Sequence, residues 1–219
     1  MIYKEVLEGI YESLFDYFGP QNWWPAETRF EVIVGAILTQ STTWHNVEKA
    51  IANLKSVGIL HFKGLLNTPE KDIAELIRPS GYYNMKARKL KRIIEYLAHV
   101  CGGNLEEFFK RPLPELRNEL LKVYGVGPET ADSILLYAGE RASFVIDAYT
   151  RRIFRRLNII PAEWDYEESR NFFIENLPAS VQLFNEYHAL IVALGKEFCV
   201  ARNPKCEGCP LQYICTCTV

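Results

Sequence analysis

The placing of its cysteines constrains this 219-residue chain more than any other feature. Five of the six cysteines lie within the last 21 residues, whereas the first 198 residues contain only Cys101. Secreted domains that depend on disulfides distribute their cysteines along the chain, because each bridge has to close a loop. Cysteines gathered at one end of a chain instead predict a site that binds metal.

The spacing of four of these cysteines narrows the kind of metal. It reads Cys199-x6-Cys206-x2-Cys209-x5-Cys215, and zinc ribbons usually need two C-x2-C pairs where this chain has one. Four thiolates on a compact loop of 17 residues can hold a four-iron, four-sulfur cluster, with one cysteine per iron. Zinc or free thiols remain the alternatives. We interpret Cys101 as a small core residue, and Cys217 is left over.

Apolar residues recur every three or four positions through most of the chain, which predicts helices and no strands. Thr68 is expected to cap a helix that has Pro69 at its first position, and Asp165 with Glu168 can form a capping box. A first helix places Ile2, Val6, Ile10 and Leu14 on one face. Further helices are expected around residues 27–39, 47–54, 73–77, 87–97, 113–121, 128–138 and 183–194.

Charge gives a mixed signal about nucleic acid. The net charge of −2 argues weakly against it, because phosphate binding usually leaves a basic surface. Two basic runs, over residues 86–92 and 151–156, could form such a surface, although each could equally be a solvated helix face. No apolar run reaches the roughly 20 residues that cross a bilayer, and the N-terminus is unlike a secretory signal. We therefore expect a cytoplasmic protein associated with the nucleoid.

A glycine-containing turn lies between two predicted helices, in the segment that runs from Leu121 to Ala131. Gly125 and Gly127 allow backbone shapes that a side chain would block. Such a turn can offer successive N–H groups to a phosphate beside the positive end of the next helix. A plain helix–helix turn is the default interpretation of so short a motif. The candidate DNA-binding residues in this turn are Gly125, Val126, Gly127 and Thr130.

With its flanking residues, this segment resembles the helix-hairpin-helix of the endonuclease III superfamily of DNA glycosylases. That family has an aspartate in a V-D-x-x-x-x-R context about 20 residues later, which Val145–Arg152 resembles, with Asp147 and Arg151 in it. Gln40 matches the glutamine that fills the gap left by the extruded base. Gly81–Ala87 resembles the G-x-Y-x-x-K-A turn, and the family carries the same cysteine spacing. The resemblance covers about residues 27–215, in the family's order, and implies a [4Fe–4S] cluster.

The hairpin departs from the pattern of the family members that also cleave the strand. Those members place a lysine nucleophile where this chain has Glu129, and a carboxylate cannot form an imine. The resemblance therefore implies an enzyme that releases the base without cleaving the strand. Asp147 would stabilise the positive charge that builds on the sugar, or act on water. It can also be a helix N-cap, and both roles are compatible.

Three residues are candidates for a base pocket. Trp24 and Trp44 resemble the paired aromatics of the 3-methyladenine glycosylase branch, where an indole face attracts a cationic methylated purine. Lys196 matches a pocket lysine of that branch, although a solvent-exposed helix end is the default interpretation. Tyr187 and His188 are interpreted as core or lobe-interface residues.

Together these features predict an all-α, two-lobe, endonuclease III-like fold and a monomer that binds duplex DNA containing a damaged base. One lobe is a six-helix barrel with the hairpin, over residues 26–135. The other joins residues 1–25 to 136–219 and carries the cluster, with the active cleft between the lobes. The expected activity is removal of alkylated purines. Removal of uracil, mismatched thymine or oxidised pyrimidines is one alternative, and a non-catalytic DNA-binding protein is another.

Overall fold

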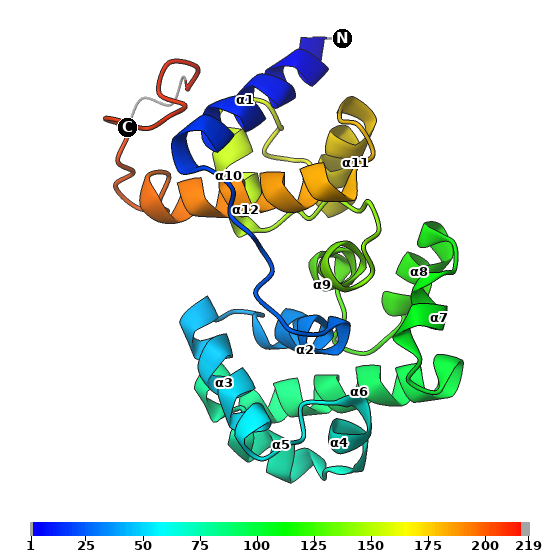
Figure 1. Ribbon diagram of the computed structural model, residues 1–219. Coiled ribbons are helices and arrows are strands. Elements are labelled where there is room, and N and C mark those ends of the chain that lie inside the picture. Colours follow the sequence, from blue (N-terminus) through cyan, green and yellow to red (C-terminus); the bar gives the residue numbers. More distant parts are fainter. Residues whose placement is uncertain (1, 216–219) are drawn as a thin grey trace. The chain divides into compact units, whose positions relative to one another are not determined.

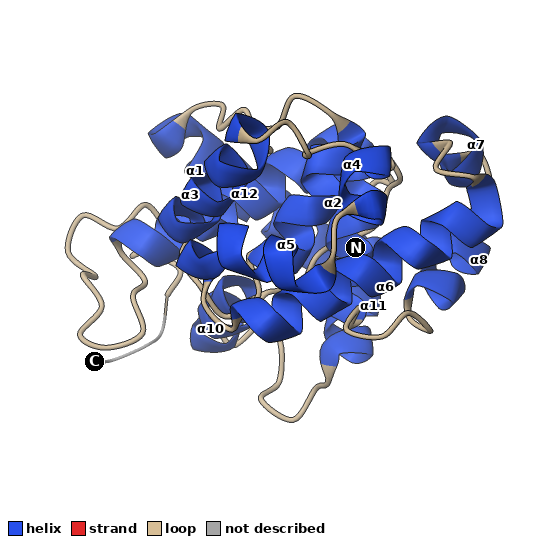
Figure 2. Ribbon diagram, turned by 90° about the horizontal axis from the view of Figure 1, so that it is seen from below, coloured by secondary structure: helices blue, strands red, loops and turns tan. Residues whose placement is uncertain are grey.

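The computed structural model describes residues 2–215, and every regular element in this part of the chain is a helix (Figure 2). The chain divides into two compact units. The hairpin unit is Ala26–Arg141, and the cluster unit joins the chain before Ala26 to the chain after Arg141. The second boundary thus lies six residues beyond the expected position at 135. None of the described helices combines the length and the apolar character that a membrane span requires.

The hairpin unit is built around helix α2 (Arg29–Leu38), which is buried along nearly its whole length. Thr28 caps α2 by accepting a hydrogen bond from the Glu31 N–H, so the helix begins where the apolar run begins. The remaining elements of this unit are α3 (Trp44–Ser56), α4 (Phe62–Asn67), α5 (Glu70–Leu76), η1 (Arg78–Ser80), α6 (Tyr83–Cys101), α7 (Leu105–Phe109), α8 (Leu113–Leu120), α9 (Pro128–Ser133) and η2 (Ile134–Ala138). Of these, helices α3, α6 and α9 and the π-helical turn η2 pack against α2.

The prediction that Thr68 caps a helix with Pro69 at its first position was wrong. Pro69 is itself the N-cap of α5, which begins at Glu70, and no side chain caps that helix end. The Thr68 hydroxyl instead donates to the Gly64 carbonyl at 2.7 Å and ends α4. A threonine can serve either the helix before it or the helix after it, and the short α4 was not predicted.

The cluster unit contains α1 (Ile2–Phe18), α10 (Ala148–Arg156), α11 (Tyr166–Asn176) and α12 (Val181–Glu197). Helix α12 packs against both α1 and α10, and α1 and α12 lie side by side in Figure 1. The core of the unit is aromatic, with the Phe144 and Phe173 rings stacked 4.3 Å apart. Buried Tyr187 donates its hydroxyl to the Leu7 carbonyl at 2.8 Å, which confirms it as a core residue. The predicted capping box of Asp165 and Glu168 opens α11.

The basic run over residues 86–92 forms no continuous solvated face. Lys86 is 2% exposed, and Lys91 donates to the carbonyls at the end of α4, including Leu66 at 2.6 Å. Arg88 lies 3.6 Å from the Glu70 carboxylate, and Arg92 lies 2.9 Å from that of Glu95. Lys86 and Lys91 therefore hold segments of the hairpin unit together, whereas Arg88 and Arg92 form exposed ion pairs that add little.

Arg117 and Asp132 form a buried ion pair in the hairpin unit. The Arg117 guanidinium donates to both Asp132 carboxylate oxygens, at 2.9 and 3.0 Å, and Asp132 is fully buried. We expect Arg117→Met to destabilise the protein by about 3 kcal/mol, because it strips this partner from a buried charge. Urea unfolding followed by circular dichroism measures the change. Arg117→Met/Asp132→Leu, which removes both charges, should recover most of the loss, and equal losses in the two variants would contradict this account.

Candidate functional site

The turn from Val123 to Gly127 joins α8 to α9 and has the shape expected of a hairpin. Gly125 has φ +86°, and a Cβ added there would collide with the aliphatic stem of Lys89. Both the backbone and the space therefore require glycine at this position. Gly127 is extended and serves as the N-cap of α9, with Pro128 at the first helical position.

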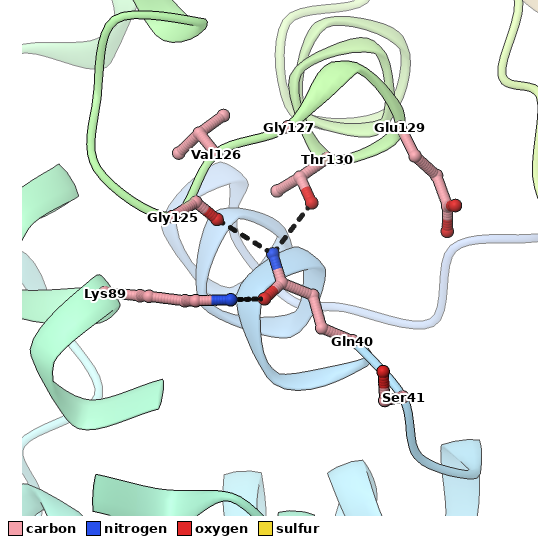
Figure 3. Close-up of a pocket in the computed structure, with 8 residues that line it drawn as sticks. All are labelled: Gln40, Ser41, Lys89, Gly125, Val126, Gly127, Glu129 and Thr130. Atoms are coloured by element: carbon pink, nitrogen blue, oxygen red, sulfur yellow. Dashed lines mark hydrogen bonds between the residues drawn. The ribbon is translucent and has the colours of Figure 1, made fainter. Parts of the chain in front are cut away.

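Gln40 is bound to this hairpin, as Figure 3 shows. Its amide N–H groups donate to the Gly125 carbonyl at 3.0 Å and to the Thr130 hydroxyl at 2.9 Å. The Lys89 ammonium donates to the Gln40 amide oxygen at 2.6 Å. These contacts fix which way the amide points. The structure thus brings together predicted DNA-binding residues from two distant segments, and it adds Lys89, which the sequence interpretation missed within a general basic run.

These side chains line a pocket of about 520 Å³. Glu129 lies on its wall, in the first turn of α9, and is exposed to solvent (Figure 3). The pocket therefore carries a carboxylate at the position where the strand-cleaving relatives are expected to carry an amine. Its lining residues are Gln40, Ser41, Lys89, Gly125, Val126, Gly127, Glu129 and Thr130.

Lys86 fastens the segment before Gln40 to the G-x-Y-x-x-K-A turn. Its ammonium donates to the Leu38 carbonyl at 2.8 Å, at the end of α2, and to the Ser80 carbonyl at 2.6 Å. Tyr82, the second residue of this turn, adopts φ +44° and is 67% exposed. The exposed turn is thus held by a cation that is itself buried.

Asp147 is the N-cap of α10 in the cluster unit. Its Oδ1 accepts from the Thr150 N–H at 2.7 Å and from the Thr150 hydroxyl at 2.9 Å. Its Oδ2 lies 3.6 Å from Nε2 of His188 on α12, and 13% of the Asp147 side chain is exposed. The capping role is therefore confirmed, and it leaves the second oxygen to a different partner.

The surroundings of Asp147 favour the ionised carboxylate. Burial raises the pKa of Asp147, but the contact with His188 and the hydrogen bonds from Thr150 outweigh burial and hold the pKa below its usual value. The group is thus an anion at neutral pH and can stabilise a nearby positive charge. His188 is buried, as expected, but its contact with Asp147 was not predicted. A single histidine in an apolar helix gives no sequence pattern from which its contact with a distant aspartate could be predicted.

The other candidates are placed as follows. Trp24 is half-buried in the cluster unit, with its ring 5.1 Å from that of Trp23. Trp44 is half-buried at the first position of α3, in the hairpin unit. Lys196 is exposed near the end of α12, as its default interpretation has it, and Arg151 is half-buried on α10.

The four spaced cysteines fit an iron–sulfur cluster. Burial raises the pKa of the Cys209 thiol, the Leu211 N–H opposes this, and Cys199, Cys215 and Cys206 raise it again, so each of these three cysteines lies close enough to Cys209 to act on its charge. Among residues 2–215, no three histidine, cysteine or acidic side chains converge on a single metal ion. A cubane instead takes one thiolate at each iron. Cys101 is half-buried rather than a full core residue, and Cys217 lies outside the described residues.

Arginines of α10 hold the cysteine loop to the cluster unit. Arg152 donates to the carbonyls of Gly195 and Cys199. Arg156 donates to the Val200 and Ala201 carbonyls and contacts the Cys199 sulfur at 3.2 Å. Arg152 and Arg156 of this basic run are therefore engaged inside the protein, as Lys86 and Lys91 of the first run are.

An all-helical chain with a glycine hairpin, an ionised aspartate at a helix N-cap and a four-cysteine loop has the features of an iron–sulfur DNA glycosylase. Two family models match it: the HhH-GPD superfamily base excision DNA repair protein over residues 34–179, and the iron-sulfur binding domain of endonuclease III over residues 199–215. The first match spans more than half of the chain. The chain belongs to the HhH-GPD superfamily of base excision DNA repair glycosylases, and the predicted [4Fe–4S] loop is confirmed.

Similar proteins agree with this assignment. A protein of Methanocaldococcus jannaschii, named as a DNA repair glycosylase, is 51% identical over 98% of this chain and 96% of its own length. An H. pylori 3-methyladenine DNA glycosylase, solved with 1,N6-ethenoadenine, is 29% identical with a TM-score of 0.74, over 89% of this chain and 95% of that one. An endonuclease III–DNA complex has a TM-score of 0.83 at 22% identity, over 99% and 96%, which confirms the fold.

The position of Lys86 makes stability depend on pH in a specific direction. Burial, and then the charge of Lys89, lower the pKa of Lys86 from 10.5 to about 8. Between these two values the unfolded chain holds the proton more strongly than the folded protein, so the contribution of Lys86 to stability rises with pH. The melting temperature of the wild type minus that of Lys86→Met should therefore increase from pH 7.5 to pH 10. A difference in melting temperature that stays constant or decreases over this pH range would contradict the expected titration of Lys86.

Proposed function

We propose that this protein is a monofunctional DNA glycosylase that releases alkylated purines of the 3-methyladenine type. The observation that carries the proposal is the carboxylate of Asp147, which is held by donors at defined positions and kept ionised. Cleavage of an N-glycosidic bond builds positive charge on the sugar. A fixed anion in a largely water-excluded position stabilises that charge without having to reorganise.

Glu129 supports a reaction that stops at the abasic site. Strand cleavage by a lyase needs an amine that attacks the sugar carbon and forms an imine. The hairpin pocket offers the Glu129 carboxylate, and the one amine among its lining residues, that of Lys89, is bound to the Gln40 amide oxygen. Water is then the nucleophile, and Asp147 orients or deprotonates it.

Several features support an alkylated purine as the base. Trp24 and Trp44 supply indole faces, and a cationic methylated purine is attracted to such a face more strongly than a neutral base. A cationic base is also a good leaving group, so one carboxylate suffices for catalysis. The similarity to a 3-methyladenine glycosylase supports the same class of lesion.

DNA binding is proposed to rest on the hairpin, on Gln40 and on exposed cations. The Gly125–Gly127 turn presents N–H groups to a phosphate. Gln40 fills the gap that the extruded base leaves. Arg202 and Lys205, both exposed on the cluster loop, add phosphate contacts.

Duplexes that each carry one defined lesion test the substrate and Asp147 together. We expect release of 3-methyladenine by the wild type and a loss of about 10³-fold in the single-turnover rate of Asp147→Asn. The variant should still bind duplex that contains an abasic site. Release from uracil or thymine glycol but not from 3-methyladenine would overturn the lesion class. No release from any duplex, with equal abasic-site binding by both proteins, would favour a non-catalytic DNA-binding protein.

Borohydride trapping tests the assignment of Glu129. The wild type should leave intact abasic strands and form no covalent adduct with DNA when borohydride is present, because no amine attacks the sugar. Glu129→Lys places an amine at the position of the relatives' nucleophile and is expected to form a trapped adduct and cut strands. An adduct formed by the wild type would contradict monofunctional activity, and Lys89→Met would then show whether Lys89 is the nucleophile.

A further inference from the structure

We propose that His188 is a positioning residue for Asp147: its imidazole holds Oδ2 of the carboxylate while Thr150 holds Oδ1. The inference rests on the proposed function, since it assigns a role in the reaction of the same carboxylate. His188 does not touch the DNA or the reacting atoms in this account. It acts through Asp147 alone.

The geometry separates the two carboxylate oxygens of Asp147. Both donors to Oδ1 come from Thr150, one turn along the same helix, and are part of an ordinary N-cap. The contact with Oδ2 comes from Nε2 of His188, which belongs to α12 and is distant in sequence. An N-cap needs only one oxygen. The contact between His188 and Oδ2 is therefore not needed to cap α10. In this account it limits rotation of the Asp147 carboxylate about χ2.

The stretch of α12 that carries His188 is held in place by the contacts of neighbouring residues. His188 is 7% exposed, and its neighbour Tyr187 is anchored to the Leu7 carbonyl on α1. One residue earlier, Glu186 accepts a hydrogen bond from the Gln21 N–H at 2.6 Å. Helix α10 packs against the same helix, and its Arg152 binds the Gly195 carbonyl there. The backbone that carries His188 is thus held against α10, and the buried imidazole lies 3.6 Å from the carboxylate that it is proposed to position.

The chemistry explains why such a contact would matter. The carboxylate has to stay ionised and keep one orientation while positive charge grows on the sugar. An imidazole with a proton on Nε2 presents an N–H to Oδ2 whether it is neutral or cationic. At 3.6 Å the contact is longer than a full hydrogen bond, and such contacts commonly shorten when the substrate binds. Misplacement of a catalytic group by about 1 Å can cost a hundredfold in rate.

Two substitutions separate a positioning role from a core-filling role. His188→Leu fills the space but has no donor. His188→Gln also fills it and places an amide N–H near the position of Nε2, but it does not take up a proton. A residue that only fills the core should tolerate leucine at least as well as glutamine, because His188 is 7% exposed and burial of an amide costs more than burial of an apolar side chain. If His188 positions Asp147, glutamine should be tolerated better than leucine, because only glutamine keeps an N–H donor.

The experiment compares the holoenzymes of the wild type and both variants in single-turnover base release as a function of pH. Circular dichroism and iron content check that each variant is folded and carries its cluster. We expect His188→Leu to be slower by 10- to 100-fold and His188→Gln to stay within a few-fold of the wild type. The acid limb of the pH–rate profile should move to higher pH in His188→Leu, because Asp147 loses a neighbour that favours its anion. Equal rates with an unmoved acid limb would overturn the inference and leave the proposed function intact.

A second readout keeps the two proposals distinguishable. If the wild type releases no base from any lesion, the proposed function fails, and the pKa of the Asp147 carboxyl is then measured by carbon-13 NMR titration. A higher pKa in His188→Leu than in the wild type, with His188→Gln between them, supports the contact independently of activity. The same pKa in all three proteins overturns it.

Discussion

The contacts that α10 makes along its length organise the cluster unit. At its N-terminus, Asp147 closes the helix and keeps one carboxylate oxygen outside the cap. From its middle and its C-terminus, Arg152 and Arg156 bind the carbonyls that lead into the cysteine loop. The helix is only nine residues long, so the position of the catalytic candidate and the path of the cluster loop are set by one short rigid element. The cluster then closes a loop whose beginning is already fixed.

Much of the fold could be predicted from the sequence because it depends on local rules. Helix spacing, the hairpin glycines and the capping box of Asp165 are decided within a few residues of one another. The cysteine spacing is equally local. Thr68 shows the limit of such rules, since a threonine between two helices can serve either one, and only packing decides.

The contacts that define the candidate site were harder to predict, because they join segments far apart in the chain. Gln40 was expected to face DNA, and nothing in the sequence shows that Lys89 binds its amide oxygen. His188 was likewise expected only to be a core or lobe-interface residue. The resemblance to a family locates the residues of a motif, whereas the partners that orient them depend on tertiary packing.

A net charge of −2 is compatible with DNA binding, because the number of basic residues in this chain does not measure how it would recognise phosphate. Lys86 and Lys91 bind backbone carbonyls inside the hairpin unit, and Arg152 and Arg156 do so inside the cluster unit. These cations satisfy helix ends and loops, so their number says little about phosphate binding. Phosphate recognition by a hairpin depends on backbone N–H groups instead, which carry no formal charge and do not enter a charge count. A near-neutral composition is therefore a poor argument against DNA for this fold, and the shape of the turn at Gly125 is a better one in its favour.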